Sequence, residues 1–245
     1  MGDLRRRPRL RTGPSRVTHV AAAADLGELV GFYTDPPTGV RANMIFSADG
    51  AAAFAGRAGP LSDPTDHGLL LALRLLADVV LVGAGTARAE GYGPVRLGVA
   101  GIERADPPPI AVVSGSGRLP ESLFADPAQR PILVTTARSA HDPRFPRDDR
   151  RDVLIAGEDR VDVAGLVAQL RKRGLRRILC EGGPTLLDHL VAADLIDEIC
   201  VTLAPKLAGV QPVGDGGRAL TAPRELRLDH VVTHDDYLYL KYSRR

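Results

Sequence analysis

Residues 77–86 read Ala-Asp-Val-Val-Leu-Val-Gly-Ala-Gly-Thr, and this stretch decides the fold class. Val79–Val82 is an unbroken apolar run, mostly of β-branched residues, which is typical of a strand buried on both faces of a parallel sheet. The Gly-rich turn Gly83-Ala-Gly-Thr86 follows at its carboxyl end. Ligands of open α/β sheets bind at that end of the strands. The stretch therefore predicts a parallel-sheet strand that ends at a candidate binding site.

A helix is predicted immediately before this strand. Asp63 can cap its N-terminus, Pro64 suits the first helical position, and Asp66 lies three residues beyond the cap. Leucines then recur at helical spacing up to residue 76. Further upstream, apolar and small residues alternate over 40–46, which predicts a strand that runs into the turn 47–50.

Strands and helices continue to alternate after this region. Short apolar strands are predicted at 110–113, 131–134, 153–155 and 177–180, and helices at 163–170 and 184–192. Three further strands are predicted at 198–203, 225–232 and 237–242, the last two as an antiparallel pair. This order favours an α/β fold with one mixed, mostly parallel sheet, helices on both faces and antiparallel C-terminal strands. Residues 36–245 are expected to form one domain, and residues 1–35 a partly disordered N-terminal arm.

The composition is that of an ordinary globular protein, with 44% hydrophobic and 25% charged residues in 245. A net charge of +2 provides no overall field that would attract nucleic acid or a membrane. The arginine run at 5–11 is interpreted as a solvated leader, because no aromatic residues accompany it. No membrane span or signal peptide is predicted, so the expected location is cytoplasmic. Cys180 and Cys200 are interpreted as reduced core thiols, and no metal site is predicted.

A second Gly-rich turn, Glu181-Gly-Gly-Pro-Thr185, follows the strand at 177–180. Gly182 and Gly183 let the backbone approach a ligand closely, and Pro184 begins a helix whose free N–H groups suit a phosphate. A plain tight turn between strand and helix is the alternative. The first turn does not match the usual dinucleotide fingerprint, because Arg88 stands where the third glycine belongs. A conventional dinucleotide-binding dehydrogenase is therefore disfavoured.

Taken in order, these motifs resemble the pyrimidine reductase domain of riboflavin biosynthesis over residues 40–242. The motifs that carry the resemblance are Asn43…Ser47-Ala-Asp49-Gly50, Leu73-Arg74, Ala77–Thr86, Glu181–Leu186, Asp197-Glu198 and Ala204-Pro205…Gly209. The resemblance implies a dihydrofolate-reductase-like fold, NADPH as cofactor, a small-molecule substrate and a homodimer. In bifunctional relatives a zinc deaminase precedes the reductase, but its His-x-Glu and Pro-Cys-x-x-Cys motifs are missing from this sequence. A free-standing reductase is expected.

The resemblance also assigns roles to individual residues. For the cofactor, the resemblance implies that the backbone around Ile45 lies beside the nicotinamide. It implies that two turns hold the remainder of the cofactor. The first turn contributes Gly83, Gly85 and Thr86, and the second contributes Gly182, Gly183, Pro184, Thr185 and Leu186. The strand ends at 114–118 and 135–138, which carry Ser114 and arginines, suit a 2′-phosphate. Arg74 matches a position that contacts an anionic substrate group, and Glu181 matches a substrate-facing acid. Each of these roles has a structural alternative. Arg74 could be a surface arginine, Glu181 a charge at a strand end, and Asp49 part of a plain turn.

The segment 88–96 departs from the family pattern. Glu90 occupies the family's acidic position, Tyr92 adds a flat ring suited to stacking, and Arg96 is displaced by one residue from the expected arginine. All three are expected to contact the substrate. The departure puts the identity of the substrate in question, but not the hydride chemistry.

The favoured function is NADPH-dependent reduction of 5-amino-6-(5-phosphoribosylamino)uracil. Hydride would pass from the nicotinamide C4 to C1′ of the open-chain sugar imine, and Glu181, Glu90 or Asp49 would supply the proton. One alternative is a dihydrofolate or dihydropterin reductase, which the fold and the altered segment also suit. The other is a non-catalytic NADP-binding protein, which the two intact Gly-rich turns oppose.

Overall fold

The computed structural model describes residues 19–209, 220 and 222–245. The strands in this part are β1 (His19–Ala22), β2 (Val40–Ser47), β3 (Val79–Gly83), β4 (Ile110–Val113), β5 (Ile132–Thr135), β6 (Asp152–Ile155), β7 (Ile178–Cys180), β8 (Ile196–Ala204), β9 (Leu226–His234) and β10 (Tyr237–Arg244). The helices are α1 (Leu26–Gly31), α2 (Pro64–Leu76), α3 (Ala84–Ala89), α4 (Ala137–His141), α5 (Val163–Lys172) and α6 (Pro184–Ala192), with 3-10 turns η1 (Gly59–Leu61) and η2 (Glu121–Phe124). The arginine run at 5–11 lies outside the described residues.

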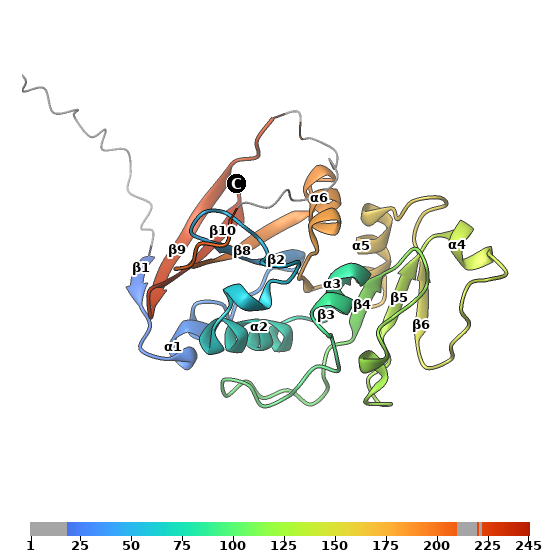
Figure 1. The fold of residues 1–245 in the computed structure, drawn as a ribbon, viewed down its shortest axis with the longest axis horizontal. Coiled ribbons are helices and arrows are strands. Elements are labelled where there is room, and N and C mark those ends of the chain that lie inside the picture. The colour runs from blue at the N-terminus through green and yellow to red at the C-terminus, as the bar shows by residue number, and fades with distance from the viewer. Residues whose placement is uncertain (1–18, 210–219, 221) are drawn as a thin grey trace, which may run out of the picture.

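The strands form a single sheet in the order β1-β9-β10-β8-β2-β7-β3-β4-β5-β6 (Figure 1). From β8 to β6 all neighbours are parallel, whereas β10 is antiparallel to both β8 and β9. The predicted mixed, mostly parallel sheet with antiparallel C-terminal strands is therefore confirmed. Its parallel part places the carboxyl ends of β2, β3 and β7 side by side, which is where a ligand site was expected.

Helix α2 begins as the sequence predicts. The Asp63 side chain accepts a hydrogen bond of 2.7 Å from the backbone N–H of Asp66, and Pro64 occupies the first turn. Leu69 and Leu73 face inward and are almost fully buried. The cap fixes the first turn of α2, and this turn reaches the candidate site described below.

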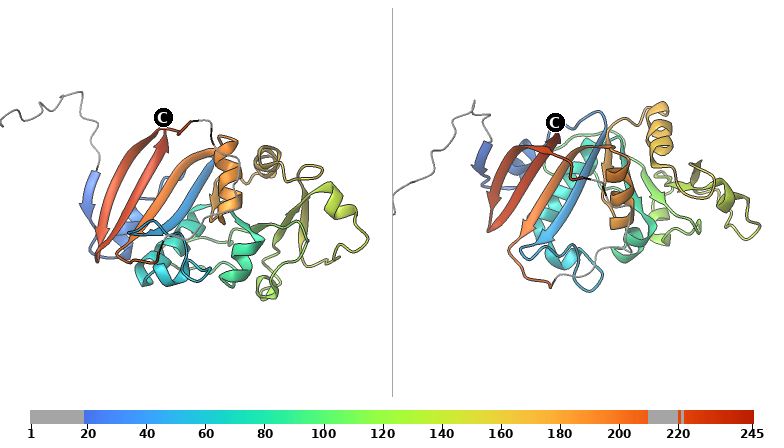
Figure 2. Two further views of the ribbon diagram at one scale, coloured as in Figure 1. Left: turned by 45° about the horizontal axis from the view of Figure 1, so that its top comes forward. Right: turned by 90° about the horizontal axis from the view of Figure 1, so that it is seen from above.

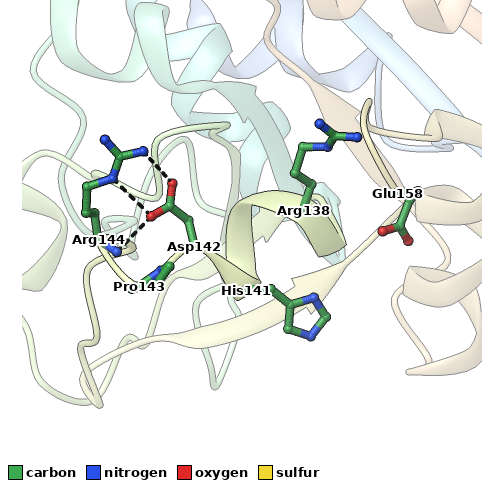
Figure 3. Close-up of a pocket in the computed structure, with 6 residues that line it drawn as sticks. All are labelled: Arg138, His141, Asp142, Pro143, Arg144 and Glu158. Carbon is green, nitrogen blue, oxygen red and sulfur yellow. Dashed lines mark hydrogen bonds and ion pairs between the residues drawn. The ribbon is translucent and has the colours of Figure 1, made fainter.

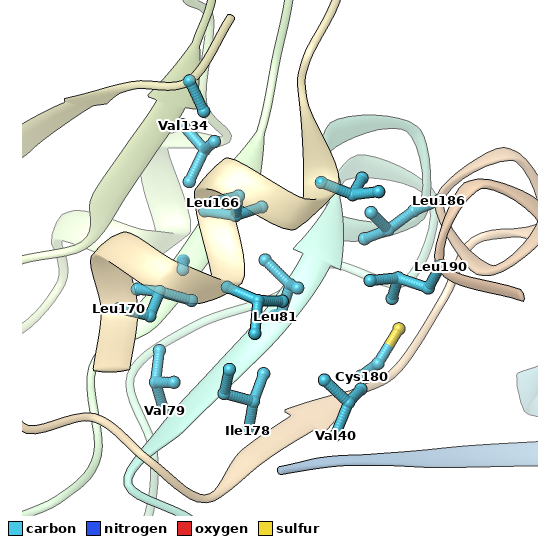
Figure 4. Packing of buried hydrophobic residues seen from close by; sticks show 14 of the residues in the cluster. Val40, Val79, Leu81, Val134, Leu166, Leu170, Ile178, Cys180, Leu186 and Leu190 are labelled. Carbon is cyan, nitrogen blue, oxygen red and sulfur yellow. The ribbon is translucent and has the colours of Figure 1, made fainter. Parts of the chain in front are cut away.

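Helices cover both faces of the sheet. On one face α5 and α6 pack against β2, β3 and β7, and Leu166, Leu170 and Leu190 are completely buried there (Figure 4). On the other face α1 and α2 cover a second cluster, which reaches β8, β9 and β10. The two layers hold the central strands rigidly, so the strand ends form a stable base for a site.

Part of the predicted N-terminal arm is packed into the domain. Residues 19–22 form β1, which pairs in parallel with β9, and residues 26–31 form α1, which Asp25 caps through the N–H of Glu28. Leu29 and Val30 are buried in the α1–α2 layer. The prediction that the arm extends to residue 35 is wrong, because this short amphipathic helix gains its stability from tertiary packing that a local pattern does not show. Residues 1–18 lie outside the described part.

One area of the sheet has no helix over it in the described part of the chain. Val201 and Leu203 of β8 pair with Leu240 and Leu238 of β10, and all four point away from the α1–α2 layer. Figure 2 shows β8, β9 and β10 open on this side, with α6 lying beside them rather than over them. We call these four residues the uncovered sheet face.

Candidate functional site

Two cavities open at the carboxyl ends of the parallel strands, and Thr86 of α3 lines both of them. The first, of about 420 Å³, lies between β2, α2 and the segment after α3. We call it the substrate-side cavity, because the sequence analysis predicts substrate contacts for several of its residues. The second, of about 660 Å³, lies between the end of β3, the end of β4 and the start of α6. We call it the cofactor-side cavity, because the sequence analysis predicts cofactor contacts for most of its glycines. The two spaces therefore meet at one residue.

Arg74, Tyr92 and Glu181 form a buried network in the wall of the substrate-side cavity. Arg74 Nε and Nη2 donate to the two carboxylate oxygens of Glu181 at 2.8 and 2.7 Å. The Tyr92 hydroxyl donates to Glu181 Oε2 at 2.5 Å, and the Arg74 guanidinium lies 4.8 Å from the centre of the Tyr92 ring. Each side chain thus fixes the other two.

The network shifts the pKa values of Arg74 and Tyr92. Burial alone would lower the pKa of Arg74, but the charge and hydrogen bonds of Glu181 raise it above the ordinary arginine value. Burial, with the nearby charge of Glu181, raises the pKa of Tyr92 well above that of a free phenol. Tyr92 is therefore a neutral hydrogen-bond donor at neutral pH, and the charges of Arg74 and Glu181 cancel locally.

The sequence analysis places Arg74 and Glu181 separately against the substrate. In the structure they lie at the substrate-side cavity but are bonded to each other, although 107 positions separate them in the sequence. A guanidinium that is engaged in this way offers less charge to an anion than the sequence suggests. No pattern in a single sequence reveals such a pair, because it depends on α2 and β7 being brought together.

Glu90 and Arg96 also line the substrate-side cavity, as the sequence predicts for the segment 88–96. Glu90 Oε1 accepts a hydrogen bond of 2.6 Å from the N–H of Ala58, and Arg57 Nε lies 3.7 Å from Glu90 Oε2. The Glu90 carboxylate therefore anchors the loop ahead of η1. Arg96 is exposed at the rim.

Asp49 does not line either cavity. It accepts hydrogen bonds from Ser47 Oγ at 2.5 Å and from the backbone N–H groups of Ala208 and Gly209 at 3.1 and 2.8 Å. The hydrogen bond from Ser47, with those backbone groups, lowers the pKa of Asp49. The structure thus places this catalytic candidate in a loop-anchoring turn, because its oxygens are already occupied away from the cavities.

The cofactor-side cavity collects most of the predicted cofactor residues. Its lining includes Gly83, Gly85, Thr86, Ser114, Gly183, Pro184, Thr185 and Leu186. Gly182 and Gly183 are joined by a cis peptide bond, and Gly182 has a φ of +81°, which favours glycine. Ile45 instead lines the substrate-side cavity. Two separate Gly-rich turns are thus brought to one space.

Three polar residues near the start of α2 line the substrate-side cavity, although the sequence analysis does not assign them to a site. They are Ser62, Asp66 and His67, at and just after the start of α2. Asp66 was interpreted only as part of the helix start. The sequence does contain a signal for Asp66. Asp63 and Asp66 both stand at the start of the helix, and one carboxylate is enough to cap it, so the second acid is free for another role.

A third hollow lies on the surface around α4, and Figure 3 shows its lining residues. Asp142 pairs with Arg144 at 3.0 Å, whereas Arg138, His141 and Glu158 point in different directions. Arg138 pairs with Asp159 of the cofactor-side cavity. Because its polar groups do not converge, this hollow is not the candidate site.

Within residues 19–209, 220 and 222–245, no group of three or more His, Cys, Asp or Glu side chains is arranged to hold a metal ion. Cys180 and Cys200 are buried free thiols, and burial raises the pKa of Cys180 to about 12. None of the helices in the described part has the length and apolar character to span a bilayer.

Comparisons with known proteins show the family of the chain. Residues 38–239 match the RibD C-terminal domain family. The chain is 28% identical over 209 residues to the 2,5-diamino-6-ribosylamino-4(3H)-pyrimidinone 5′-phosphate reductase of Methanothermobacter thermautotrophicus, covering 82% of this chain and 95% of the relative. The predicted resemblance and the predicted oxidoreductase class are thereby confirmed.

Solved structures show the same fold. A pyrimidine reductase-like protein from Corynebacterium diphtheriae superposes with a TM-score of 0.74 at 24% identity, covering 90% of this chain and 98% of that chain. Dihydrofolate reductase from Enterococcus faecalis, complexed with NADP(H) and RAB-propyl, gives a TM-score of 0.50 at 11% identity, covering 85% of this chain and 97% of that chain. The predicted dihydrofolate-reductase-like fold is confirmed. The chain therefore belongs to the RibD C-terminal domain family, the reductase family that its ordered motifs predict.

Proposed function

We propose that the protein is an NADPH-dependent reductase of a ribosylaminopyrimidine 5′-phosphate. The observation that carries the proposal is that Thr86 lines both the substrate-side and the cofactor-side cavity, so that ligands in the two spaces meet. NADPH held by the residues of the cofactor-side cavity would supply a hydride to C1′ of the open-chain sugar imine. A proton goes to the imine nitrogen, and the product is the ribitylamino compound.

The cofactor-side cavity fits a nucleotide phosphate. Gly183 at the start of α6 makes no side-chain cap, so the N–H groups of Thr185 and Leu186 keep the free donor character of a helix N-terminus. A Cβ atom added at Gly85 or Gly115 would meet nothing within 4 Å, so both glycines border open space. Uncapped helix donors beside an open, glycine-bordered cavity are what a pyrophosphate requires.

The chain's own part in the reaction is to bind and orient the pyrimidine. The network of Arg74, Tyr92 and Glu181 forms a rigid wall, because each member holds two hydrogen-bonded or stacked partners. Holding the reacting carbon close to the hydride donor provides most of the rate enhancement in such a reaction. Of the predicted proton donors, Glu181 and Glu90 line the cavity and Asp49 does not.

We expect the enzyme to prefer NADPH to NADH by at least about tenfold in kcat/KM. Ser114 and Ser116 stand at the end of β4, and Arg118 follows them with an exposed side chain. The acid in the cavity, Asp159, is paired with Arg138. Hydroxyls and guanidinium groups suit a 2′-phosphate, and a paired acid offers no acceptor for free ribose hydroxyls.

The measurement is steady-state turnover with each cofactor. Arg118→Ala should lower the ratio of kcat/KM with NADPH to kcat/KM with NADH. Arg173 is an exposed arginine at the end of α5, and Arg173→Ala should leave this ratio unchanged. Equal kcat/KM values for the two cofactors in the wild-type protein contradict the expectation.

Turnover with NADPH and candidate substrates tests the function itself. The ribosylaminopyrimidine phosphates should be reduced, whereas oxidation of NADPH only in the presence of dihydrofolate would identify a dihydrofolate reductase instead. The observation that favours this alternative is Tyr92 in the altered segment 88–96, because a flat ring in the cavity wall also suits a pterin. Cofactor binding without turnover of either class would identify a non-catalytic NADP-binding protein.

We also propose that two copies associate through the uncovered sheet face. Apolar side chains on a paired strand surface lose water contact when a second such surface packs on them. Leu238→Glu should therefore convert a dimer to a monomer in analytical ultracentrifugation, whereas Leu207→Glu, at an exposed position outside the sheet, should not. A wild-type protein that sediments as a monomer contradicts this.

The predicted cytoplasmic location and the predicted lack of a nucleic-acid partner stay predictions.

A further inference from the structure

The 3-10 turn η1 and the residues at its two ends form one wall of the substrate-side cavity. Ala58, Gly59 and Ser62 line this cavity, and none of the three lines the cofactor-side cavity. The turn itself is only three residues long. So short a turn keeps a fixed shape only through partners outside it, because its own hydrogen bonds do not repay the cost of ordering the chain.

Lys206, in the segment after β8, supplies such a partner. Its half-buried side chain ends at η1, where Nζ donates to the carbonyl oxygens of Pro60, Leu61 and Ser62 at 3.0, 2.9 and 3.0 Å. These bonds use all three donors of the ammonium group. The carbonyl groups at the end of a helical turn lack partners within the turn, so one cation satisfies them together. Lys206 thus fixes the carbonyl end of η1.

The other end of η1 is held by the opposite charge. The N–H of Ala58 donates to Glu90 Oε1 at 2.6 Å. A carboxylate at the N–H end and an ammonium group at the carbonyl end match the direction of the peptide dipoles. The wall of the cavity is therefore clamped between two charged side chains that come from separate segments of the chain.

The backbone around Lys206 is in turn fixed by the turn after β2. Asp49 accepts hydrogen bonds from the N–H groups of Ala208 and Gly209 at 3.1 and 2.8 Å, and the N–H of Ala48 donates to the carbonyl oxygen of Lys206 at 2.9 Å. Hydrogen bonds to an ionised carboxylate are stronger than those between neutral groups. Asp49 thus reaches the cavity wall indirectly, through the segment that carries Lys206.

We propose that Lys206 is a positioning residue, which holds η1 in the shape that binds the pyrimidine, and that Asp49 acts on the cavity through Lys206. The inference rests on the proposed function, because the pyrimidine is the ligand proposed for this cavity. A wall that is already ordered binds more tightly, because the ligand does not bear the cost of ordering it. Loss of the clamp should therefore weaken binding of the pyrimidine but not of NADPH.

Lys206→Met tests the clamp, because it removes the ammonium group and keeps an unbranched apolar side chain. The probe is the 5′-phosphate of 2,5-diamino-6-ribosylamino-4(3H)-pyrimidinone, the compound in the name of the Methanothermobacter relative. Its affinity, measured by calorimetry without cofactor, should fall roughly 10- to 100-fold, as for the loss of a charged hydrogen-bonding group. The affinity for NADPH should be unchanged.

A fall in both affinities, or in neither, overturns the inference. A wild-type protein that does not bind the pyrimidine overturns the inference and the proposed function together. Binding without turnover contradicts the proposed function alone, and the effect of Lys206→Met on binding still decides the inference.

Restoring the charge chemically tests whether the ammonium group itself is required. Lys206→Cys treated with 2-bromoethylamine carries an ammonium group on a side chain of the length of lysine. Cys180 and Cys200 are almost fully buried, so the new thiol is the one that reacts. The aminoethylated variant should recover most of the pyrimidine affinity, whereas alkylation with neutral iodoacetamide should not. Equal recovery with both reagents overturns the inference.

Lys241→Met is the matched control. Lys241 is also half-buried and its Nζ also donates to a backbone carbonyl, that of Phe32 at 3.1 Å, but it lines neither cavity. The substitution should lower the thermal stability and leave the pyrimidine affinity unchanged. If it weakened pyrimidine binding as much as Lys206→Met, the effect would be a general loss of stability, and the inference would be wrong.

A double variant tests the role of Asp49. Asp49→Asn should weaken pyrimidine binding by a smaller factor than Lys206→Met, because asparagine keeps one acceptor for the backbone. Combined with Lys206→Met it should add almost nothing, since residues that act through one another are not additive. Additive losses would show that Asp49 acts independently of Lys206, and would overturn this part of the proposal.

Discussion

Arg74→Ala is expected to lower the free energy of unfolding by about 3–5 kcal/mol and kcat/KM by roughly 30- to 1000-fold. The reason for the first effect is that Glu181 has a side-chain exposure of 3%, so removal of Arg74 leaves a buried carboxylate without its counter-ion. The second follows because Glu181 and Tyr92 lose the partner that orients them in the cavity wall. Chemical denaturation and steady-state kinetics measure the two effects.

A double variant separates stability from function. Arg74→Met combined with Glu181→Gln removes both charges, and should recover most of the lost stability because no unpaired buried charge remains. Turnover should stay low, because the oriented wall is not restored. Recovery of turnover together with stability would show that the pair is only structural. Arg144→Ala breaks an exposed pair with Asp142 and should change neither quantity appreciably.

Gly183→Val is expected to weaken NADPH binding by roughly 10- to 150-fold, the range that corresponds to an overpacked contact. The sequence predicts that the new side chain would project into the phosphate space. The structure shows that a Cβ atom at this position would lie 2.4 Å from Thr86 Oγ1, so the side chain would press on the residue shared by the two cavities. Titration of NADPH, followed by its fluorescence, measures the loss.

Gly183→Ala with and without Thr86→Ala distinguishes the two explanations. If the clash with Thr86 causes the loss, removal of Oγ1 restores binding; if the phosphate needs the space, the double variant stays defective. Gly31→Ala, where an added Cβ meets nothing within 4 Å, is the control for glycine replacement. Unchanged NADPH affinity in Gly183→Val would show that the turn after β7 holds no part of the cofactor.

Local patterns were sufficient for most of the fold. The apolar run at 79–82, the cap at Asp63 and the Pro184 helix start are signals within a few residues, and β3, α2 and α6 follow them. The short helices α1, α3 and α4 were missed, since they have five or six residues and depend on packing rather than on propensity. In particular α3 begins inside the predicted Gly-rich turn.

The sequence predicts which residues belong to the candidate site, but not which of their side chains bond to one another. Arg74, Tyr92 and Glu181 were each singled out, yet their mutual hydrogen bonds depend on three distant segments meeting at one strand edge. The sequence does not reveal the partners of Asp49 for the same reason, because they lie at 208–209, which are remote in the sequence. The sequence does not identify Asp66 as a residue of the cavity wall, because an acid near a helix start already has a local explanation.

The parallel pairing of β1 with β9, which joins His19 to His230, has a consequence for how the chain folds. Strand β2 likewise pairs with β7 and β8, whose residues come more than half the chain later. Pairings of such high contact order form slowly, because the long loop must close before any contact is gained. During synthesis β1 and β2 are made long before their partner strands. Until then the backbone N–H and C=O groups along their edges are unpaired, and such edges can pair with other chains and cause aggregation. The sheet is therefore completed only after the last two strands have been made, and a chain interrupted before residue 226 leaves β1 without a neighbour in this sheet and β8 with β2 alone.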